Sequence, residues 1–419
     1  MEPVPRVGRV FFPLDEDLGL RPGTLTPKHQ DHLAHLSTWM PFERACQMLE
    51  TLLGIQVSEP TARRATERAG SLLEARQTTQ SQQPATPSAV MTLCEKQVVS
   101  TDGCYVPLVK GQWAEVRTVA IGEIQQKAGK KGQAPQTQHL SYFSRMMDAE
   151  TFGQRAEVEM RRRGVSQAKA VCAVTDGADW IQGFIDLHRA DALRVLDFPH
   201  AAEHLSDLTL ALQQAGITLP EGVFERSLHI LKHRGPGLLL RWCDRLPCAV
   251  IEQEDVHKHL NYFRKRVALM EYPTYRQQGW PIGSGMVESA NKVVVQARLK
   301  GAGMRWSSTQ VNPMLTLRTA VCSERWDESW QDMLAEHQTQ RDQARQHRVS
   351  ARFEARLSSL LLLLLRFRPP TPIPTPQPTL PPAPRPVEPA ATLPGSSRPS
   401  AHHPWKKGPA CHPKLVAKK

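Results

Sequence analysis

The hydrophobic and polar positions divide the chain into helical segments at both ends, with an alternating region of strands and helices between them. In the first 76 residues, apolar side chains recur at helical spacing, and Ser58 is placed to cap a second helix after a glycine-containing turn. Arg63 and Arg64 lie on that second helix. This pattern predicts a helical, helix-turn-helix-like segment at 1–76 that contacts DNA, and an ordinary helical pair with surface arginines fits it as well.

Short apolar runs typical of strands follow a polar, proline-containing linker at 77–93. The predicted strands are 94–101, 113–121, 140–143, 168–175 and 193–198, and the predicted helices are 148–163, 178–189 and one that begins near His200. Three strands followed by helix, strand, helix, strand and helix is the element order of an RNase H-like domain. We therefore predict an α/β fold whose first catalytic part, at 94–204, holds a mixed five-stranded sheet flanked by helices.

The second half of the chain has an almost wholly helical pattern. We interpret 205–278 as an all-helical insertion into the core and 279–347 as a helix carrying Glu288 followed by further helices. A helical extension at 348–368 precedes the segment 369–419, which is rich in proline, basic and poor in apolar residues. That composition predicts a disordered tail.

The charge of the chain is uneven. The net charge is +12, but nine Lys/Arg against one Glu lie from Arg366 onward, which leaves only about +4 on the body. No apolar stretch reaches 18 residues, the leucine run at 360–365 is too short to span a bilayer, and Met1 is followed by no apolar signal segment. The eight cysteines lack metal-site spacing. We expect a cytoplasmic protein with reduced thiols and no membrane partner.

Three carboxylates are candidates for a shared site. Asp102 and Asp176 each follow a predicted buried strand, and these two strands are neighbours in an RNase H-like sheet. Glu288 lies in the first turns of a helix that Ser284 is placed to cap. Converging carboxylates repel unless a cation joins them, so this site predicts Mg²⁺, with Mn²⁺ as the alternative ion. Individually, the two Asp-Gly pairs also fit simple turns, and the helix fits a capped surface helix with a Glu–Lys pair.

The order of these residues and their flanks resembles the DDE transposases of bacterial insertion sequences, most closely the Kra-type group, over roughly residues 20–330. The motifs that carry the resemblance are 100–103 (STDG), 113–116 (WAEV), 174–181 (VTDGADWI), 196–205 (LDFPHAAEHL), 281–289 (PIGSGMVES) and 298–306 (RLKGAGMRW). The resemblance implies that Asp102, Asp176 and Glu288 form a catalytic, metal-binding triad. It also implies an RNase H-like core with an insertion before the glutamate.

The same resemblance implies DNA strand cleavage at transposon ends and transfer to a target. The partners would be double-stranded DNA, as terminal inverted repeats and target, and further copies of the chain on that DNA, at the bacterial nucleoid. The zinc-ribbon cysteines of some relatives do not occur near the N-terminus, so end recognition would depend on the helical segment at 1–76.

Two other functions fit parts of the sequence. His200, Glu203 and His204 match H-x-x-E-H, the inverted zinc-peptidase motif, which predicts a zinc metallopeptidase. Alternatively, His200 and His204 lie near the catalytic pocket, or they are plain structural histidines. A non-catalytic DNA-binding protein derived from a transposase would use the helical N-terminus and the tail, with an inert triad.

Basic residues surround the predicted glutamate helix. They are Lys292, Arg298, Lys300 and Arg305, and a transposase would use them to contact DNA phosphates. A solvated helix face gives the same pattern. Trp306 fits a core tryptophan, and it also fits a side chain that stacks on an unpaired base at the transposon end.

Overall fold

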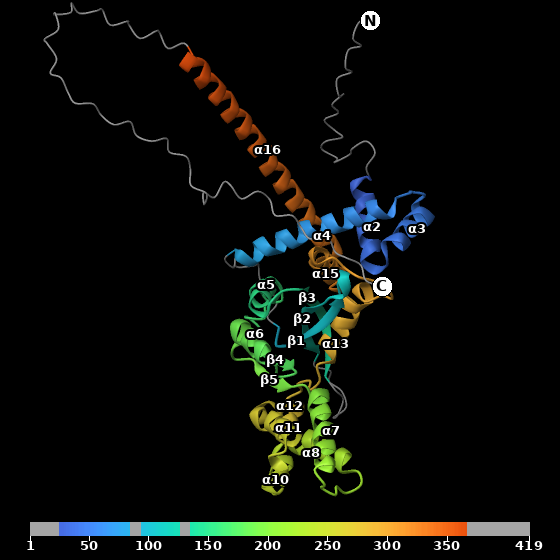
Figure 1. The fold of residues 1–419 in the computed structure, drawn as a ribbon, viewed down its shortest axis with the longest axis vertical. Coiled ribbons are helices and arrows are strands. Elements are labelled where there is room, and N and C mark those ends of the chain that lie inside the picture. The colour runs from blue at the N-terminus through green and yellow to red at the C-terminus, as the bar shows by residue number, and fades with distance from the viewer. Residues whose placement is uncertain (1–24, 84–93, 126–134, 367–419) are drawn as a thin grey trace, which may run out of the picture. The chain divides into compact units, whose positions relative to one another are not determined.

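A mixed five-stranded sheet forms the centre of the protein (Figure 1). The computed structural model describes residues 25–83, 94–125 and 135–366, so the predicted tail at 369–419 lies outside the described residues. The strands are β1 (Lys96–Pro107), β2 (Trp113–Gln125), β3 (Gln136–Arg145), β4 (Ala170–Thr175) and β5 (Leu193–Leu196). Their order is β3-β2-β1-β4-β5, with the first three antiparallel and β1, β4 and β5 parallel. The predicted α/β class and sheet are confirmed, and the arrangement is compatible with an RNase H-like core.

Alternating residues of the strands build a core on each face of the sheet. Val99 on β1 packs with Phe152 and Phe184, which belong to helices α5 (Ala149–Arg162) and α6 (Asp179–Arg189). Cys104 and Val106 on the same strand point to the opposite face. That face is covered by α13 (Gly285–Ala290), the π-helix η3 (Asn291–Gln296), α14 (Ala297–Leu299) and α15 (Ser308–Cys322).

The N-terminal helices share a core with the C-terminal ones. They are α2 (Pro27–Trp39), α3 (Phe42–Leu53) and α4 (Glu59–Gln82). Helices α2 and α4 pack on α15 and on the first turns of α16 (Trp326–Arg366), while α3 packs on α2 and α4. The turn after α3 is made by Gly54, whose φ of 67° is left-handed. Ser58 stands at the N-cap of α4, as predicted, but its hydroxyl contacts Thr61 Oγ1 at 2.9 Å instead of a backbone amide.

The predicted start of a linker at residue 77 is wrong, because α4 continues to Gln82. Polar side chains suggested a linker, but arginines of β3 and α5 hold this end of the helix. Arg145 donates to Gln77 Oε1, and Arg155 Nη1 donates to Ser81 Oγ at 2.9 Å. The rest of the predicted linker, 84–93, lies outside the described residues.

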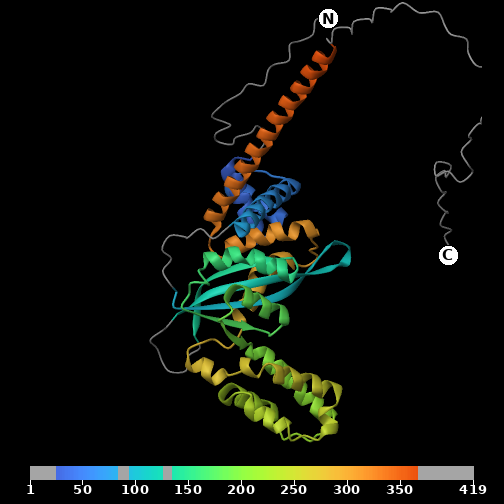
Figure 2. The same ribbon diagram turned by 90° about the vertical axis from the view of Figure 1, so that its left-hand side faces the viewer.

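The segment between β5 and the Glu288 helix is helical, as predicted. It contains α7 (Phe198–Gln214), α8 (Val223–Arg234), α9 (Gly237–Cys243), α10 (Cys248–Ile251), α11 (Glu254–Lys265), the 3-10 turn η2 (Val267–Leu269) and α12 (Tyr272–Gln277). These helices form a core of their own against β4 and β5. Figure 2 shows this helical insertion at one end of the sheet and the N-terminal helices at the other. Among the described helices, none is both long enough and apolar enough to cross a membrane.

Candidate active site

The register of β1 and β4 brings Asp102 and Asp176 together. The two strands are parallel and paired from Lys96↔Ala170 to Val99↔Ala173, an offset of 74 residues. Asp102 and Asp176 have the same offset and lie three residues beyond the last of these pairs, close enough for the charge of Asp176 to act on Asp102. Neighbouring strands lie about 4.8 Å apart. Asp176 directly follows β4, as predicted, but Asp102 lies within β1, which continues to Pro107, so the predicted end of this strand at residue 101 is wrong.

The environment of Asp102 opposes its ionisation. Burial raises the pKa of Asp102 above its ordinary value, and the negative charge of Asp176 raises it further. Two donors act in the other direction: the Gly103 amide, 2.7 Å from Oδ1, and Asn291 Nδ2, 2.8 Å from Oδ2. A cation between the two carboxylates would relieve the same repulsion.

Helix α11 of the insertion holds the turn that carries Asp176. Tyr262 donates its hydroxyl to the Asp176 carbonyl at 3.1 Å, and Arg266 Nη2 donates to the Gly177 carbonyl at 2.9 Å. Gly177 has a φ of +80°, and a Cβ there would lie 2.6 Å from Arg266 Nε, so the turn requires glycine. Sequence reasoning missed Tyr262 and Arg266, since nothing in the local pattern of α11 links it to a strand 86 residues earlier.

Glu288 lies on α13, on the same helical segment as Asn291. Ser284 precedes α13 as predicted, but its Oγ donates to Glu288 Oε1 at 3.2 Å and makes no cap bond to a backbone amide. Asn291, one turn after Glu288, reaches Asp102, so this segment contacts the aspartate pair through the asparagine. Within the described ranges, no three or more His, Cys, Asp or Glu side chains form a group arranged to hold a metal ion. The structure thus brings Asp102 and Asp176 together, and it bonds Asp102 to Asn291, which lies three residues after Glu288.

The residues around Asp102 fit an oxygen-liganded cation in their chemistry. The Asn291 side chain is only 3% exposed, and its Oδ1 is buried without a hydrogen-bond partner among the described residues. A buried oxygen without a donor beside two carboxylates matches the ligands that Mg²⁺ prefers.

The π-helix η3 changes which residues face outward after Glu288. An ordinary helix would place Asn291, Lys292 and Arg298 on the Glu288 face, as the sequence predicted. Lys292 is exposed like Glu288, as that face predicts, whereas Asn291 and Arg298 are buried. The predicted DNA contact of Arg298 is wrong, because its side chain is 2% exposed and its Nε donates to the Ser37 carbonyl at 2.8 Å. Burial lowers the pKa of Arg298 to about 10.

The other predicted DNA-contacting residues lie at the surface. Arg63, Arg64, Lys292, Lys300 and Arg305 are all exposed. Trp306, by contrast, is 7% exposed and packs in the core beside the Arg298 guanidinium, so it is a core tryptophan.

His200 and His204 lie on one helix but have different partners. His200 Nδ1 is 3.4 Å from the buried Asp197 Oδ2, and this contact raises the pKa of His200 to about 9, with Asp176 contributing. His204 Nδ1 lies 3.0 Å from His259 Nδ1, and burial together with that neighbour lowers the pKa of His204 to about 4. His200 therefore carries a positive charge beside the aspartate pair, while His204 stays neutral inside the insertion.

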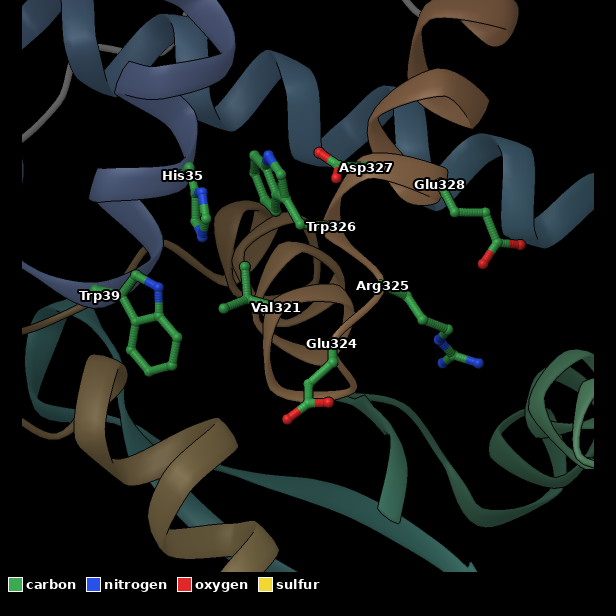
Figure 3. A pocket seen from close by; sticks show the side chains of 8 residues that line it. All are labelled: His35, Trp39, Val321, Glu324, Arg325, Trp326, Asp327 and Glu328. Atoms are coloured by element: carbon green, nitrogen blue, oxygen red, sulfur yellow. The ribbon is translucent and has the colours of Figure 1, made fainter. Parts of the chain in front are cut away.

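A separate surface pocket of about 370 Å³ lies at the junction of α15 and α16, beside α2 (Figure 3). Its lining residues are His35, Trp39, Val321, Glu324, Arg325, Trp326, Asp327 and Glu328. Several of these side chains are engaged in the fold: Arg325 pairs with Glu159, and the Trp326 indole donates to Asp31 Oδ1 at 2.7 Å. This pocket includes none of the three candidate carboxylates.

No protein-family model matches this chain, and no curated protein is significantly similar to it.

Proposed function

We propose that the protein is a DDE-type transposase with an RNase H-like core, which cuts DNA at the ends of an insertion sequence and transfers those ends to a target. The observation that carries the proposal is the proximity of Asp102 and Asp176 on adjacent parallel segments, with Asn291 of the Glu288 segment bonded to Asp102. Two carboxylates on neighbouring strands and a third on an adjacent helix are ligands that can hold the metal ions of phosphoryl transfer.

Asp102 and Asp176 would hold Mg²⁺ or Mn²⁺, with Glu288 supplying a further carboxylate. When bound, such ions lower the pKa of a nucleophilic oxygen and neutralise the leaving oxygen at phosphorus. Ser284 keeps the Glu288 carboxylate oriented through the 3.2 Å bond to Oε1. The Asn291 amide orients the Asp102 carboxylate in the same way, by donating to Oδ2.

The positively charged residues around the aspartates would favour binding of a negatively charged phosphodiester. His200, with its raised pKa, is protonated at neutral pH and offers a donor beside the two aspartates. Lys292, Lys300 and Arg305 would bind the DNA backbone, while Arg63 and Arg64 on α4 would bind the terminal repeat. The protein would act as a homo-oligomer on DNA in the bacterial cytoplasm.

A strand-transfer assay with oligonucleotide ends copied from the DNA that flanks the reading frame tests the proposal. We expect Asp102→Asn, Asp176→Asn and Glu288→Gln each to abolish joining and to leave DNA binding intact. Asp207→Asn, at an exposed position of α7, removes the same charge elsewhere and should join normally. Retained joining in any of the three variants would reject the assignment of that carboxylate. Binding without joining by the unaltered protein would favour a non-catalytic DNA-binding protein.

A zinc peptidase is not proposed, because His200 and His204 have different partners. If the purified protein contained tightly bound zinc at one ion per chain, and if His204→Gln lost this zinc, the result would support a zinc peptidase.

A further inference from the structure

The end of the β1–β2 hairpin extends beyond the other strands of the sheet. In the described residues, β3 pairs with β2 only as far as Arg117, and β4 pairs with β1 only as far as Val99. From Gly103 to Trp113, β1 and β2 pair with each other, closed by the turn Val109–Gly111. Figure 2 shows the two teal strands projecting past their neighbours.

One face of this hairpin carries two exposed aromatic side chains. Tyr105 and Trp113 are each 58% exposed. Tyr105 pairs with Glu115 and Pro107 pairs with Trp113, so the two aromatic residues are diagonal neighbours on one face. We call them the aromatic platform. The side chains on the opposite face of the hairpin pack in the protein core. Tyr105 and Trp113 are exposed and do not belong to that core, so the fold itself does not explain them.

One cation contacts the platform and two others lie on the segments next to it. Lys300 Nζ lies 5.7 Å from the centre of the Trp113 ring. Arg305 adjoins Trp306, whose backbone bonds to the hairpin at Pro107 (3.1 Å), and Lys110 lies in the hairpin turn. All three are exposed, and none has a carboxylate within ion-pair distance in the described part of the chain.

The acidic residue on this face is neutralised within the sheet. Glu115 Oε2 is 2.5 Å from Arg117 Nη2, and the Arg117 guanidinium lies 5.2 Å from the ring centre of Trp180. The hairpin end therefore offers two aromatic rings and a net positive charge.

We propose that the aromatic platform binds single-stranded DNA by stacking its bases on Tyr105 and Trp113, while Lys110, Lys300 and Arg305 bind the phosphates. Every base has a flat aromatic face, and base stacking on aromatic side chains beside cations is how single strands are held without sequence preference. Bases in a duplex are already stacked on each other, so a duplex gains less from such rings. A purely apolar protein partner would not match these three cations.

The position of the platform links it to the carboxylates, and in this respect the inference rests on the proposed function. Tyr105 is three residues after Asp102 on β1, which corresponds to about 10 Å along a strand. Side chains three residues apart on a strand point to opposite faces of the sheet, so a DNA end opened at the carboxylates would reach the platform by passing over the edge of the hairpin. The substrate class would therefore be DNA ends with unpaired bases next to the bond that reacts.

Binding of two fluorescent decamers to the full chain tests the platform, in the Asp176→Asn background so that the DNA is not cut. One decamer is oligo-dT and the other is abasic, with the same phosphates and no bases. We expect Trp113→Ala to weaken oligo-dT binding about 10-fold or more and to leave abasic binding unchanged, with Trp113→Phe retaining most of the affinity. Trp242→Ala, at a partly exposed tryptophan of α9 (39%), should bind like the background protein.

Each other outcome overturns the proposal. Unchanged oligo-dT binding in a Tyr105→Ala/Trp113→Ala protein removes the platform as a DNA site, and an equal loss for both decamers shows that phosphates alone are bound. A change in oligomeric state with unchanged DNA binding assigns the surface to a contact between copies. This measurement needs no catalysis. Single-strand binding at the platform and strand transfer are therefore tested independently, and either result can be negative while the other is positive.

Discussion

Replacing Arg318 should destabilise the protein and, with it, the segment that carries Glu288. Arg318 is fully buried on α15 and donates to three backbone carbonyls: Val294 at 3.2 Å, Val293, and Thr38 at 3.0 Å. The first two belong to η3, whose π-helical turn directly follows α13, and Thr38 lies in the last turn of α2. The guanidinium also lies 4.5 Å from the centre of the Trp39 ring.

The size of the effect follows from these contacts. A hydrogen bond to a charged group is worth about 1.5–3 kcal/mol, so three such bonds set an upper range of about 5–9 kcal/mol. Removing the guanidinium also removes its desolvation penalty, which is several kcal/mol. For Arg318→Met, which keeps much of the side-chain volume, we expect a net loss of about 3 kcal/mol from the free energy of unfolding. Arg298→Met should cost less, about 1–2 kcal/mol, because Arg298 has a single backbone acceptor in the described structure.

Urea unfolding followed by far-UV circular dichroism measures these differences, with Arg64→Met as the control at an exposed arginine. A loss below about 1 kcal/mol for Arg318→Met, or a larger loss for Arg298→Met than for Arg318→Met, would refute the reasoning. A second readout is strand transfer under conditions in which the variant is folded. Because η3 carries Asn291, loosening it should reduce joining more than it reduces DNA binding.

Two further predictions concern packing and pH. Gly70→Ala should destabilise the protein by about 1–3 kcal/mol, because the new Cβ would lie 2.4 Å from a carbonyl oxygen of α15. Gly183→Ala in α6, where a Cβ meets nothing within 4 Å, should stabilise by up to about 1 kcal/mol, and thermal unfolding giving both the same sign would contradict this. His200 has a raised pKa of about 9, so its ion pair contributes stability below its ordinary pKa and loses it as the pH rises through about 9. His200→Gln should therefore destabilise more at about pH 6 than at about pH 10, and an equal effect at both would argue against the pairing.

The sheet and the aspartate pair were accessible to sequence reasoning because both depend on local signals. A buried apolar run followed by Asp-Gly marks the end of β4 correctly at Asp176, while at Asp102 the strand continues to Pro107. The equal offset along the two parallel strands still places the two aspartates close to each other. The Glu288 helix was likewise marked by its glycine-rich entry. The element order then predicted the five-stranded sheet.

The errors arose where distant contacts decide the outcome. Nothing near Arg298 in the sequence shows that a π-helical turn precedes it, or that its side chain lies inside the protein, where Nε donates a hydrogen bond to the Ser37 carbonyl. The polar side chains at the end of α4 suggested a linker. The helix continues there because arginines from β3 and α5, much later in the chain, bind these side chains. Tyr262 contacts the Asp176 turn through a packing arrangement that no spacing rule describes.

Asp197 joins the two ends of the helical insertion by hydrogen bonds. Its fully buried carboxylate accepts from the His200 amide at 3.1 Å, at the start of α7, and from the Ser284 amide at 2.5 Å, just before α13. The Phe198 amide donates to the Ile282 carbonyl at 2.8 Å, so the two ends of the insertion meet at one point. The number and length of the helices between them can therefore vary during evolution without moving Glu288, provided that whatever replaces α11 still supports the Asp176 turn.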